Sequence, residues 1–314
     1  MPKYKSALVT GGAGFIGSHI VDALIKRRIK VYVIDDLSSG HKSNVNPNAV
    51  FYKTSVLHPG LGKLILKIKP DVVFHLAAQI DVRCSVADPP GDARVNIMGT
   101  LAMAHASAKA GVKKFVFTSS GGAIYPDDLR PPFSEKVVVD PISPYGIAKR
   151  TAEMYLAFEH RIHGLPTVTL RLANAYGPRQ ALRGSYAGVI SLFAQKMLKG
   201  EQCVINGTGK QTRDYVYVGD IVHAHMLAME KNVSGIYNIG SGIETNVNQI
   251  FQKVNRLTGA KQKEVHGASC QGEVMRSALD ATKAKRELGW KQEVSLDDGL
   301  KRTVEWFRAR TAKK

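Results

Sequence analysis

The sequence has few cysteines and no long apolar run. Its 314 residues include three cysteines, at 84, 203 and 270, which are widely spaced and form no paired motif. This usage argues against a disulfide-stapled secreted domain and fits a reduced, cytoplasmic location. No apolar stretch approaches the roughly 18 residues that a membrane-spanning helix needs, and the N-terminus leads into a predicted strand without a signal-peptide pattern. We therefore expect a cytoplasmic protein with no membrane partner.

Acidic residues are scarce relative to basic ones. The chain has 44 Lys and Arg against 26 Asp and Glu, a formal net charge of +18. Such an excess attracts anions of any kind, including phosphorylated metabolites and nucleic acid. The basic residues are scattered apart from 26–28 and 308–314, and no DNA- or RNA-binding motif accompanies them. We expect solvated basic surfaces and do not expect nucleic acid as a partner.

The first half of the sequence alternates predicted strands and helices. Short runs rich in β-branched residues are typical of buried strands, and stretches with helical spacing separate them. Repeated strand-then-helix units imply a parallel sheet covered on both faces, which is a Rossmann-type doubly wound α/β domain. The predicted strands are 6–10, 31–34, 50–52, 72–76, 115–118 and 167–172, and the predicted helices are 16–26, 91–110 and 144–163.

The pattern changes after residue 178. A helix-like stretch at 189–198, a glycine-containing turn at 206–209 and mixed segments up to residue 290 predict a smaller α/β unit. We expect residues 1–178 to form the doubly wound domain and residues 179–314 to form mainly a substrate domain, with some later segments returning to the first. Ser295 is the predicted N-cap of the last helix, with Asp298 completing a capping box. Its predicted apolar face comprises Leu296, Leu300, Val304 and Phe307.

A glycine-rich segment, TGGAGFIG at 10–17, follows the first predicted strand and opens the first predicted helix. Its glycines permit a tight turn and let backbone N–H groups approach a pyrophosphate, to which the helix N-terminus adds partial positive charge. The GxxGxxG spacing is that of short-chain dehydrogenases/reductases, and the alternative is an ordinary glycine-rich turn. The predicted cofactor-binding residues here are Gly11, Gly14, Phe15, Ile16 and Gly17.

Asp35 ends the second predicted strand. A carboxylate at this position can accept both hydroxyls of an adenosine ribose and repels a 2′-phosphate, so we predict NAD rather than NADP as the cofactor. Asp36 is the neighbouring candidate, but the alternation of the strand favours Asp35. The alternative is a capping or turn aspartate.

Tyr145 and Lys149 form the third motif, YGIAK. Residues four apart share one face of a helix, so the ammonium can lie beside the phenol. Lys149 and the positive charge of a nicotinamide could together stabilise tyrosinate near neutral pH. Ser120 follows the strand 115–118, at the sheet edge where ligands bind, and could bond a substrate hydroxyl beside Tyr145. A surface helix pair and a loop-capping serine are the alternatives.

Together these motifs resemble the extended short-chain dehydrogenases/reductases, and among them the UDP-glucose 4-epimerases and related sugar-nucleotide epimerases. The resemblance runs from about Lys5 to Phe307. It is carried by GGAGFIGSH from Gly11, DDLSSG from Asp35, HLAAQ from His75, NIMGT from Asn96, TSSGGAIY from Thr118, SPYGIAK from Ser143, RLANAYGPRQ from Arg171, NGTGKQTRDYVYVGD from Asn206 and ELGW ending at Trp290.

The resemblance implies NAD-dependent epimerisation at C4 of a UDP-hexose through a transient 4-keto intermediate, with a hydride passing to NAD and back. Tyr145 would take the proton of the sugar 4-hydroxyl, and Ser120 would bond the reacting oxygen. Lys149 would tune Tyr145 and hold the nicotinamide ribose. The residues implied to line the cofactor are Leu76, Ala77, Ala78 and Asn96.

The resemblance also implies how the UDP-sugar would be held. Asn174 and Arg213 would bind its diphosphate, for which a guanidinium suits bidentate contact. The alternatives are a turn-forming Asn174 and a surface ion pair of Arg213 with Asp214. Small Ser277 lies near the position that faces the sugar C2 group and would leave room for N-acetylated sugars.

Four positions depart from the family pattern. Ser55 stands where many members have an aspartate that contacts adenine, and Pro126 replaces a glycine after Tyr125. Cys270 stands where an arginine is expected to reach the diphosphate, and Arg276 could compensate. Ser277, discussed above, is the fourth, so the departures bear on the substrate more than on the cofactor.

Two other functions stay open. A nucleotide-sugar dehydratase or decarboxylase would use the same scaffold, although dehydratases typically carry an Asp-Glu pair where this chain has Gly121-Gly122. A non-catalytic NAD(H)-binding module is the second, and the intact Tyr145 and Lys149 argue against it. The family also implies a homodimer through the helices 91–110 and 144–163. We expect no metal, because the ten histidines show no metal-ligand spacing.

Overall fold

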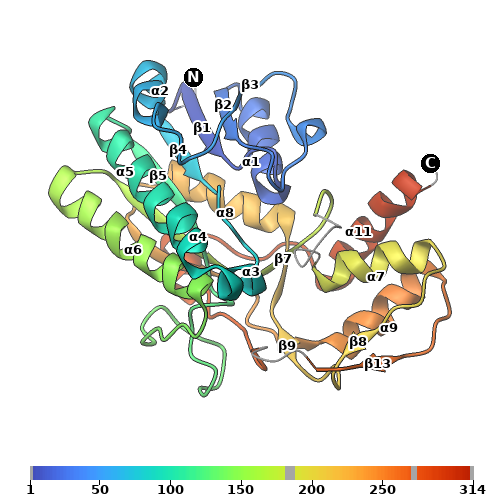
Figure 1. Ribbon diagram of the computed structural model, residues 1–314. Coiled ribbons are helices and arrows are strands. Elements are labelled where there is room, and N and C mark those ends of the chain that lie inside the picture. The colour runs from blue at the N-terminus through green and yellow to red at the C-terminus, as the bar shows by residue number, and fades with distance from the viewer. Residues whose placement is uncertain (1–2, 181–187, 270–273, 312–314) are drawn as a thin grey trace.

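A seven-stranded sheet lies at the centre of the larger lobe of the molecule (Figure 1). The computed structural model describes residues 3–180, 188–269 and 274–311. The strands of the sheet are β1 (Ser6–Thr10), β2 (Lys30–Asp35), β3 (Val50–Lys53), β4 (Val72–His75), β5 (Lys114–Ser120), β6 (Thr167–Leu172) and β11 (Gly235–Ile239). Their order is β3-β2-β1-β4-β5-β6-β11, and every neighbouring pair is parallel. The order reverses direction between β1 and β4, the place where open α/β sheets bind ligands.

Helices cover both faces of this sheet. Side chains alternate between the two faces along each strand, so a strand with an unbroken apolar run presents apolar side chains to both layers of helices. Ala7 and Val9 of β1 pack in the same apolar cluster as α1 (Phe15–Lys26) and α8 (Val218–Glu230). Leu8 points to the opposite cluster, formed with α2 (Leu61–Ile68), α5 (Gly99–Lys109) and α6 (Pro144–His163). The predicted Rossmann-type doubly wound fold is confirmed.

The prediction of one continuous helix over residues 91–110 is wrong. The stretch 91–110 is divided into α4 (Pro89–Ala93), a π-helical turn at Arg94–Met98, and α5. The start moves to Pro89 because the Asp88 side chain caps this helix by accepting the Gly91 N–H, and proline suits the first helical position. The π-helical turn holds Asn96 in a buried position, and such turns are frequent at functional sites.

A second apolar core lies in the smaller lobe, where α7 (Val189–Leu198), α9 (Val247–Thr258) and α11 (Leu296–Thr311) pack around Tyr176 and Tyr215 (Figure 1). Leu300, Val304 and Phe307 of α11 are buried there, as predicted. Ser295 Oγ accepts the N–H of Asp298, but the Asp298 carboxylate takes the Ser295 hydroxyl rather than its backbone N–H. The predicted cap is thus present, whereas the reciprocal half of the capping box is not.

Short strand pairs border this smaller lobe. They are β7 (Asn174–Tyr176) with β10 (Tyr215–Tyr217), β8 (Ile205–Asn206) with β13 (His266–Gly267), and β9 (Thr212–Arg213) with β12 (Thr245–Asn246). The remaining helices are α3 (Val82–Ala87), α10 (Thr282–Glu287) and a 3₁₀ turn at Lys42–Asn44. Although α8 and β11 come late in the sequence, they pack with the large sheet. The division of the chain at residue 178 stays a prediction.

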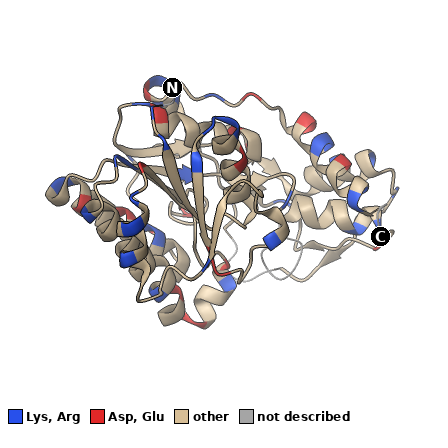
Figure 2. Cartoon of the chain, turned by 90° about the horizontal axis from the view of Figure 1, so that it is seen from above, with Lys and Arg blue, Asp and Glu red and all other residues tan. Residues whose placement is uncertain are grey.

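The charged residues are distributed over the whole chain. Figure 2 shows blue Lys and Arg segments along the elements of both lobes, with red Asp and Glu segments among them. Within residues 3–180, 188–269 and 274–311, every helix is too short or too polar to cross a bilayer.

Candidate active site

The glycine-rich turn lies at the carboxyl end of β1 and leaves a cradle that side chains would fill. Gly11 has a φ of +69°, and a Cβ there would come within 2.9 Å of the Ala77 nitrogen. A Cβ at Gly17 would fall 2.9 Å from the carbonyl carbon of Gly11. Gly14 is the N-cap of α1, which has no side-chain cap and no acidic residue in its first turn. A bare helix N-terminus over a glycine turn fits the pyrophosphate of a dinucleotide.

Asp35 lies beside this turn, at the end of β2. Its carboxylate is 7% exposed and accepts the N–H groups of Ala13 (2.9 Å) and Leu37 (2.8 Å). Burial raises the pKa of Asp35, and the two N–H donors partly offset that rise. A carboxylate fixed next to the glycine cradle is compatible with the adenosine ribose of NAD, and this contact of Asp35 stays a prediction.

Thr10 and His75 join the ends of β1 and β4 beneath the cradle. Thr10 Oγ1 accepts the N–H groups of Leu76 and Ala77, both at 3.1 Å, and lies 2.8 Å from His75 Nδ1. His75 Nε2 contacts Thr100 Oγ1 at 3.1 Å. Burial lowers the pKa of His75 to about 3, so the imidazole is neutral at physiological pH. This series of hydrogen bonds fixes the backbone at residues 76–77. The sequence motifs alone did not reveal it.

Asn96 and Asp92 hold the next part of that loop. Asn96 Oδ1 accepts the Gln79 N–H, and Nδ2 donates to Gln79 O and Asp92 Oδ1, all at 2.9 Å. Asn96 therefore holds the loop 76–79 in place by hydrogen bonds. Its contact with the cofactor stays a prediction.

Ser120, Tyr145 and Lys149 converge at the carboxyl end of β5. Ser143 caps α6 by accepting the Gly146 N–H, which places Tyr145 in the first turn. Ser120 lies close enough to the Tyr145 phenol to act on its pKa. The Lys149 Nζ atom donates to the Thr118 carbonyl at 2.9 Å and lies 5.8 Å from the centroid of the Tyr145 ring.

The protein groups alone do not make this phenol acidic. Burial raises the pKa of Tyr145 to about 12, against the opposing effect of the Ser120 side chain. Burial also lowers the pKa of Lys149 to about 8, while the carboxylates of Asp92 and Glu153 act to raise it. Lys149 thus does not by itself produce tyrosinate near neutral pH, so the predicted acidification depends on the positive charge of a bound nicotinamide.

Asp92 is a site residue that the sequence analysis missed. It is 2% exposed, its Oδ1 atom accepts bonds from Gln79 and Asn96, and its charge raises the pKa of both Tyr145 and Lys149. The sequence held one clue, because Asp92 and Asn96 are four residues apart in a predicted helix and so share a face.

Gly122, Asn174 and Ser277 meet on the opposite side of the β5 end. A Cβ at Gly122 would lie 3.6 Å from Asn174 Oδ1 and 4.0 Å from Ser277 Oγ, so a methyl group fits there at ordinary contact distance. Gly121 differs, because a Cβ there would fall 2.8 Å from Leu279 Cδ2. The two glycines thus contribute no side chains of their own to this wall of the site.

Asn174 and Arg213 both line a cavity of about 280 Å³ beneath the N-terminus of α7. Arg213 Nη1 donates to the Thr212 carbonyl at 2.8 Å. The alternative of a surface ion pair with Asp214 is wrong, because Asp214 is fully buried. Its carboxylate accepts bonds from the backbone of Ser241, Gly242 and Leu279 and from the Ser241 hydroxyl.

Arg276 is paired with Glu244, and its compensating contact with the diphosphate stays a prediction. Its guanidinium is bound by both oxygens of Glu244, at 2.9 and 2.5 Å, and Glu244 also accepts the Thr212 hydroxyl. This exposed pair holds the Arg276 side chain. Cys270, which it was expected to replace, lies outside the described residues.

Comparison with known proteins identifies the family. The sequence profile of the NAD dependent epimerase/dehydratase family matches residues 7–240. The chain belongs to this family. The prediction of an NAD-dependent enzyme similar to UDP-glucose 4-epimerases is therefore confirmed, and NAD is its cofactor.

Solved structures and a curated relative agree with this membership. A UDP-glucose 4-epimerase of Thermotoga maritima, solved with UDP-glucose, is 49% identical with a TM-score of 0.95, covering 98% of this chain and 99% of that one. A UDP-glucose 4-epimerase of Thermus thermophilus, solved with NAD, is 38% identical with a TM-score of 0.90, covering 96% and 99%. A UDP-N-acetyl-alpha-D-glucosaminuronate decarboxylase of Bacillus cytotoxicus is 35% identical over 97% of this chain and 98% of its own.

Proposed function

We propose that this family member catalyses the epimerisation at C4 of a UDP-hexose, interconverting gluco and galacto forms. The observation that carries the proposal is the convergence of Ser120, Tyr145 and Lys149 at the carboxyl end of β5. A phenol and a hydroxyl are thereby held where a sugar hydroxyl can meet both.

The side chains divide the work of proton transfer and orientation. Tyr145 Oη would accept the proton of the sugar 4-hydroxyl and return it after the ring has turned over, while Ser120 Oγ bonds the same oxygen. Lys149 Nζ, anchored on the Thr118 carbonyl, would hold the nicotinamide ribose and favour the phenolate. Bound NAD supplies the hydride acceptor. The turn Gly11–Gly17, Asp35 and the loop Leu76–Ala78 would hold it.

The UDP group would occupy the cavity beneath α7. Arg213 suits a diphosphate because its planar guanidinium can make two parallel bonds to phosphate oxygens. Asn174 lines both this cavity and the wall at Gly122, so it would stand between the diphosphate and the sugar. Ser277, which is small and buried at that wall, would allow an N-acetyl group at C2.

The two glycines at 121 and 122 also favour an epimerase over a dehydratase. A 4-keto sugar must rotate before it is reduced on its other face, and Gly121-Gly122 add no side chain to the wall beside it. A dehydratase needs acid and base side chains at these positions, and Leu279 packs against the place where a side chain of residue 121 would begin. The decarboxylase among the relatives keeps that activity as the second candidate.

Incubation of the purified protein with UDP-glucose, UDP-galactose, their N-acetyl forms and UDP-glucuronate tests the proposal. We expect C4 epimers and no release of carbon dioxide. Tyr145→Phe should lower kcat by roughly 10²- to 10⁴-fold. Turnover of none of these sugars by NAD-loaded protein, or full activity of Tyr145→Phe, would contradict it.

We also propose that the protein forms a homodimer through α5 and α6. Apolar side chains of α6 that share one face are exposed, at 50% for Ile147, 59% for Met154, 45% for Phe158 and 66% for Ile162. A second copy presenting the same face would bury them. Light scattering should give a dimer for the wild type and a monomer for Phe158→Glu/Ile162→Glu, whereas a wild-type monomer would refute the proposal.

A further inference from the structure

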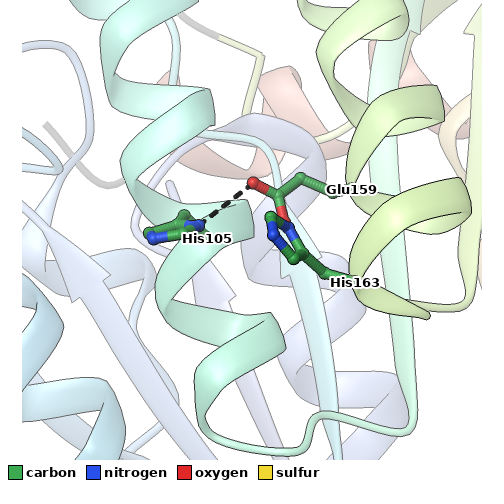
Figure 3. Close-up of side chains that lie close together, drawn as sticks. All are labelled: His105, Glu159 and His163. Atoms are coloured by element: carbon green, nitrogen blue, oxygen red, sulfur yellow. Dashed lines mark hydrogen bonds and ion pairs between the residues drawn. The ribbon is translucent and has the colours of Figure 1, made fainter.

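Three potential metal ligands meet between α5 and α6, away from the candidate active site. They are His105 from α5 and Glu159 and His163 from α6 (Figure 3). One ligand atom from each residue lies within 4.8 Å of the others. Glu159 and His163 share a helix face because they are four residues apart, and the contact of α5 with α6 brings His105 opposite them.

The carboxylate lies at the centre of this cluster. The Glu159 side chain is 1% exposed, so its charge needs partners. Among the described residues, the side-chain partners of its two oxygens are His105 Nδ1, at 3.3 Å from Oε1, and His163 Nδ1, at 2.7 Å from Oε2. Two imidazole nitrogens are thus directed at one buried carboxylate.

This donor set suits a divalent transition metal. Two imidazole nitrogens and one carboxylate oxygen are a common zinc environment with an open fourth position. Ligand atoms about 2.0–2.1 Å from a tetrahedral zinc lie roughly 3.3 Å apart. The separation of His105 Nδ1 from Oε1 of Glu159 already has that value, whereas His163 Nδ1 lies 2.7 Å from the other oxygen, Oε2. To bind one zinc, the carboxylate would therefore have to turn, or bind through both oxygens, and the His163 nitrogen would have to move away by about half an ångström.

The cluster is also accessible to an ion. The side chains of His105 and His163 are 46% and 37% exposed, in contrast to Glu159. Their rings lie 5.5 Å apart, and the Phe158 ring packs edge-on against His163 at 5.3 Å. In a single chain a metal could enter from solvent, and a water molecule could fill its fourth position. In the proposed homodimer the site would lie at the interface, because α5 and α6 also form that interface.

We propose that His105, Glu159 and His163 form a Zn²⁺ site that links α5 to α6. Zinc would bind both Nδ1 atoms, with each imidazole carrying its proton on Nε2, and would neutralise the buried charge of Glu159. The site lies fourteen residues beyond Tyr145 on α6, about 21 Å along the helix, so it adds no group to the sugar site and its direct effect is on stability. The inference does not depend on the proposed function.

Metal titration of the untagged, full-length protein after treatment with chelator tests this inference. Calorimetry with Zn²⁺ and visible absorption with Co²⁺ report stoichiometry and tetrahedral geometry. The variants are His105→Ala, His163→Ala and the double variant, with the exposed His41→Ala as the matched control. Circular dichroism checks that each variant is folded.

We expect one Zn²⁺ per chain for the wild type and for His41→Ala, and binding at least about 10-fold weaker for each single variant of the cluster. Zn²⁺ at 100 times its Kd should raise the Tm of the wild type by roughly 5 °C and leave the double variant unchanged. Clearly substoichiometric binding by the wild type, or equal binding by the double variant, would overturn the proposal. The cluster would then be a buried carboxylate hydrogen-bonded between two histidines.

Discussion

The ammonium of Lys149 lies 5.8 Å from the centre of the Tyr145 ring. Its hydrogen bond goes to the Thr118 carbonyl. The lysine therefore contributes a fixed charge and a position, and the pKa of Tyr145 responds mainly to burial. The proposed mechanism therefore assigns the ionisation of the phenol to the bound cofactor.

Titration of Tyr145 checks that view. The absorbance change of tyrosinate, taken as the difference between wild type and Tyr145→Phe, should give a pKa near 12 without NAD and a clearly lower value with it. Burial raises the folded-state pKa above that of the unfolded chain, so this residue's contribution to stability is complete below about pH 10 and is lost as pH rises toward 12. Equal values with and without NAD would mean that the nicotinamide does not act on the phenol.

Asp92 should act as a positioning residue through its charge. Asp92→Asn keeps an oxygen to accept from Gln79 and Asn96 but removes the charge that raises the pKa of Tyr145 and Lys149. The acid limb of the kcat profile should therefore move to lower pH. The exposed Asp128→Asn is the control, and a lower kcat with an unmoved pH profile would assign Asp92 a structural role only.

Gly121 and Gly122 should respond differently to the same added methyl group. Gly121→Ala must displace the buried Leu279 and should lower the free energy of unfolding by about 1–3 kcal/mol, measured by chemical denaturation. Gly122→Ala places its methyl at ordinary contact distance, so stability should hold while KM rises, most for N-acetylated sugars. An equal loss of stability in both variants would contradict the difference in space around Gly121 and Gly122.

Asp35 should set the choice of cofactor. Asp35→Asn removes a charged acceptor of ribose hydroxyls and should weaken NAD binding by about 10-fold or more, while NADP binding changes less because the repulsion of its phosphate is removed. Asp36→Asn serves as the neighbouring control. The measurement is the ratio of the two dissociation constants by calorimetry, and an unchanged ratio would move this role away from Asp35.

Much of the fold could be predicted from local sequence. Strands β1 and β6 and helices α6 and α7 have the bounds predicted for them, since apolar runs and caps such as Ser143 and Gly164 act within a few residues. The division of helix 91–110 was not predictable in this way, because Asn96 in the π-helical turn bonds to Gln79 in a loop outside the helix, 17 residues earlier.

The candidate site shows the same division. Ser120, Tyr145 and Lys149 were predictable because each is marked by its place at a strand end or on one helix face. The contact of His75 with Thr10 joins residues 65 apart in the sequence, and Arg276 reaches Glu244 across 32. Such pairings depend on how separate elements pack, so motif spacing carries no trace of them. The same is true of His105 opposite Glu159.

Helix α6 runs without interruption for twenty residues, about 30 Å. One end holds the phenol over the sheet, and the other contacts α5 where the chain offers apolar side chains and histidines to its surroundings. Because an unbroken helix is stiff, a movement of one end of α6 is transmitted to the other end. A neighbouring subunit or an ion bound at the distal end would therefore also restrict the position of the Tyr145 hydroxyl.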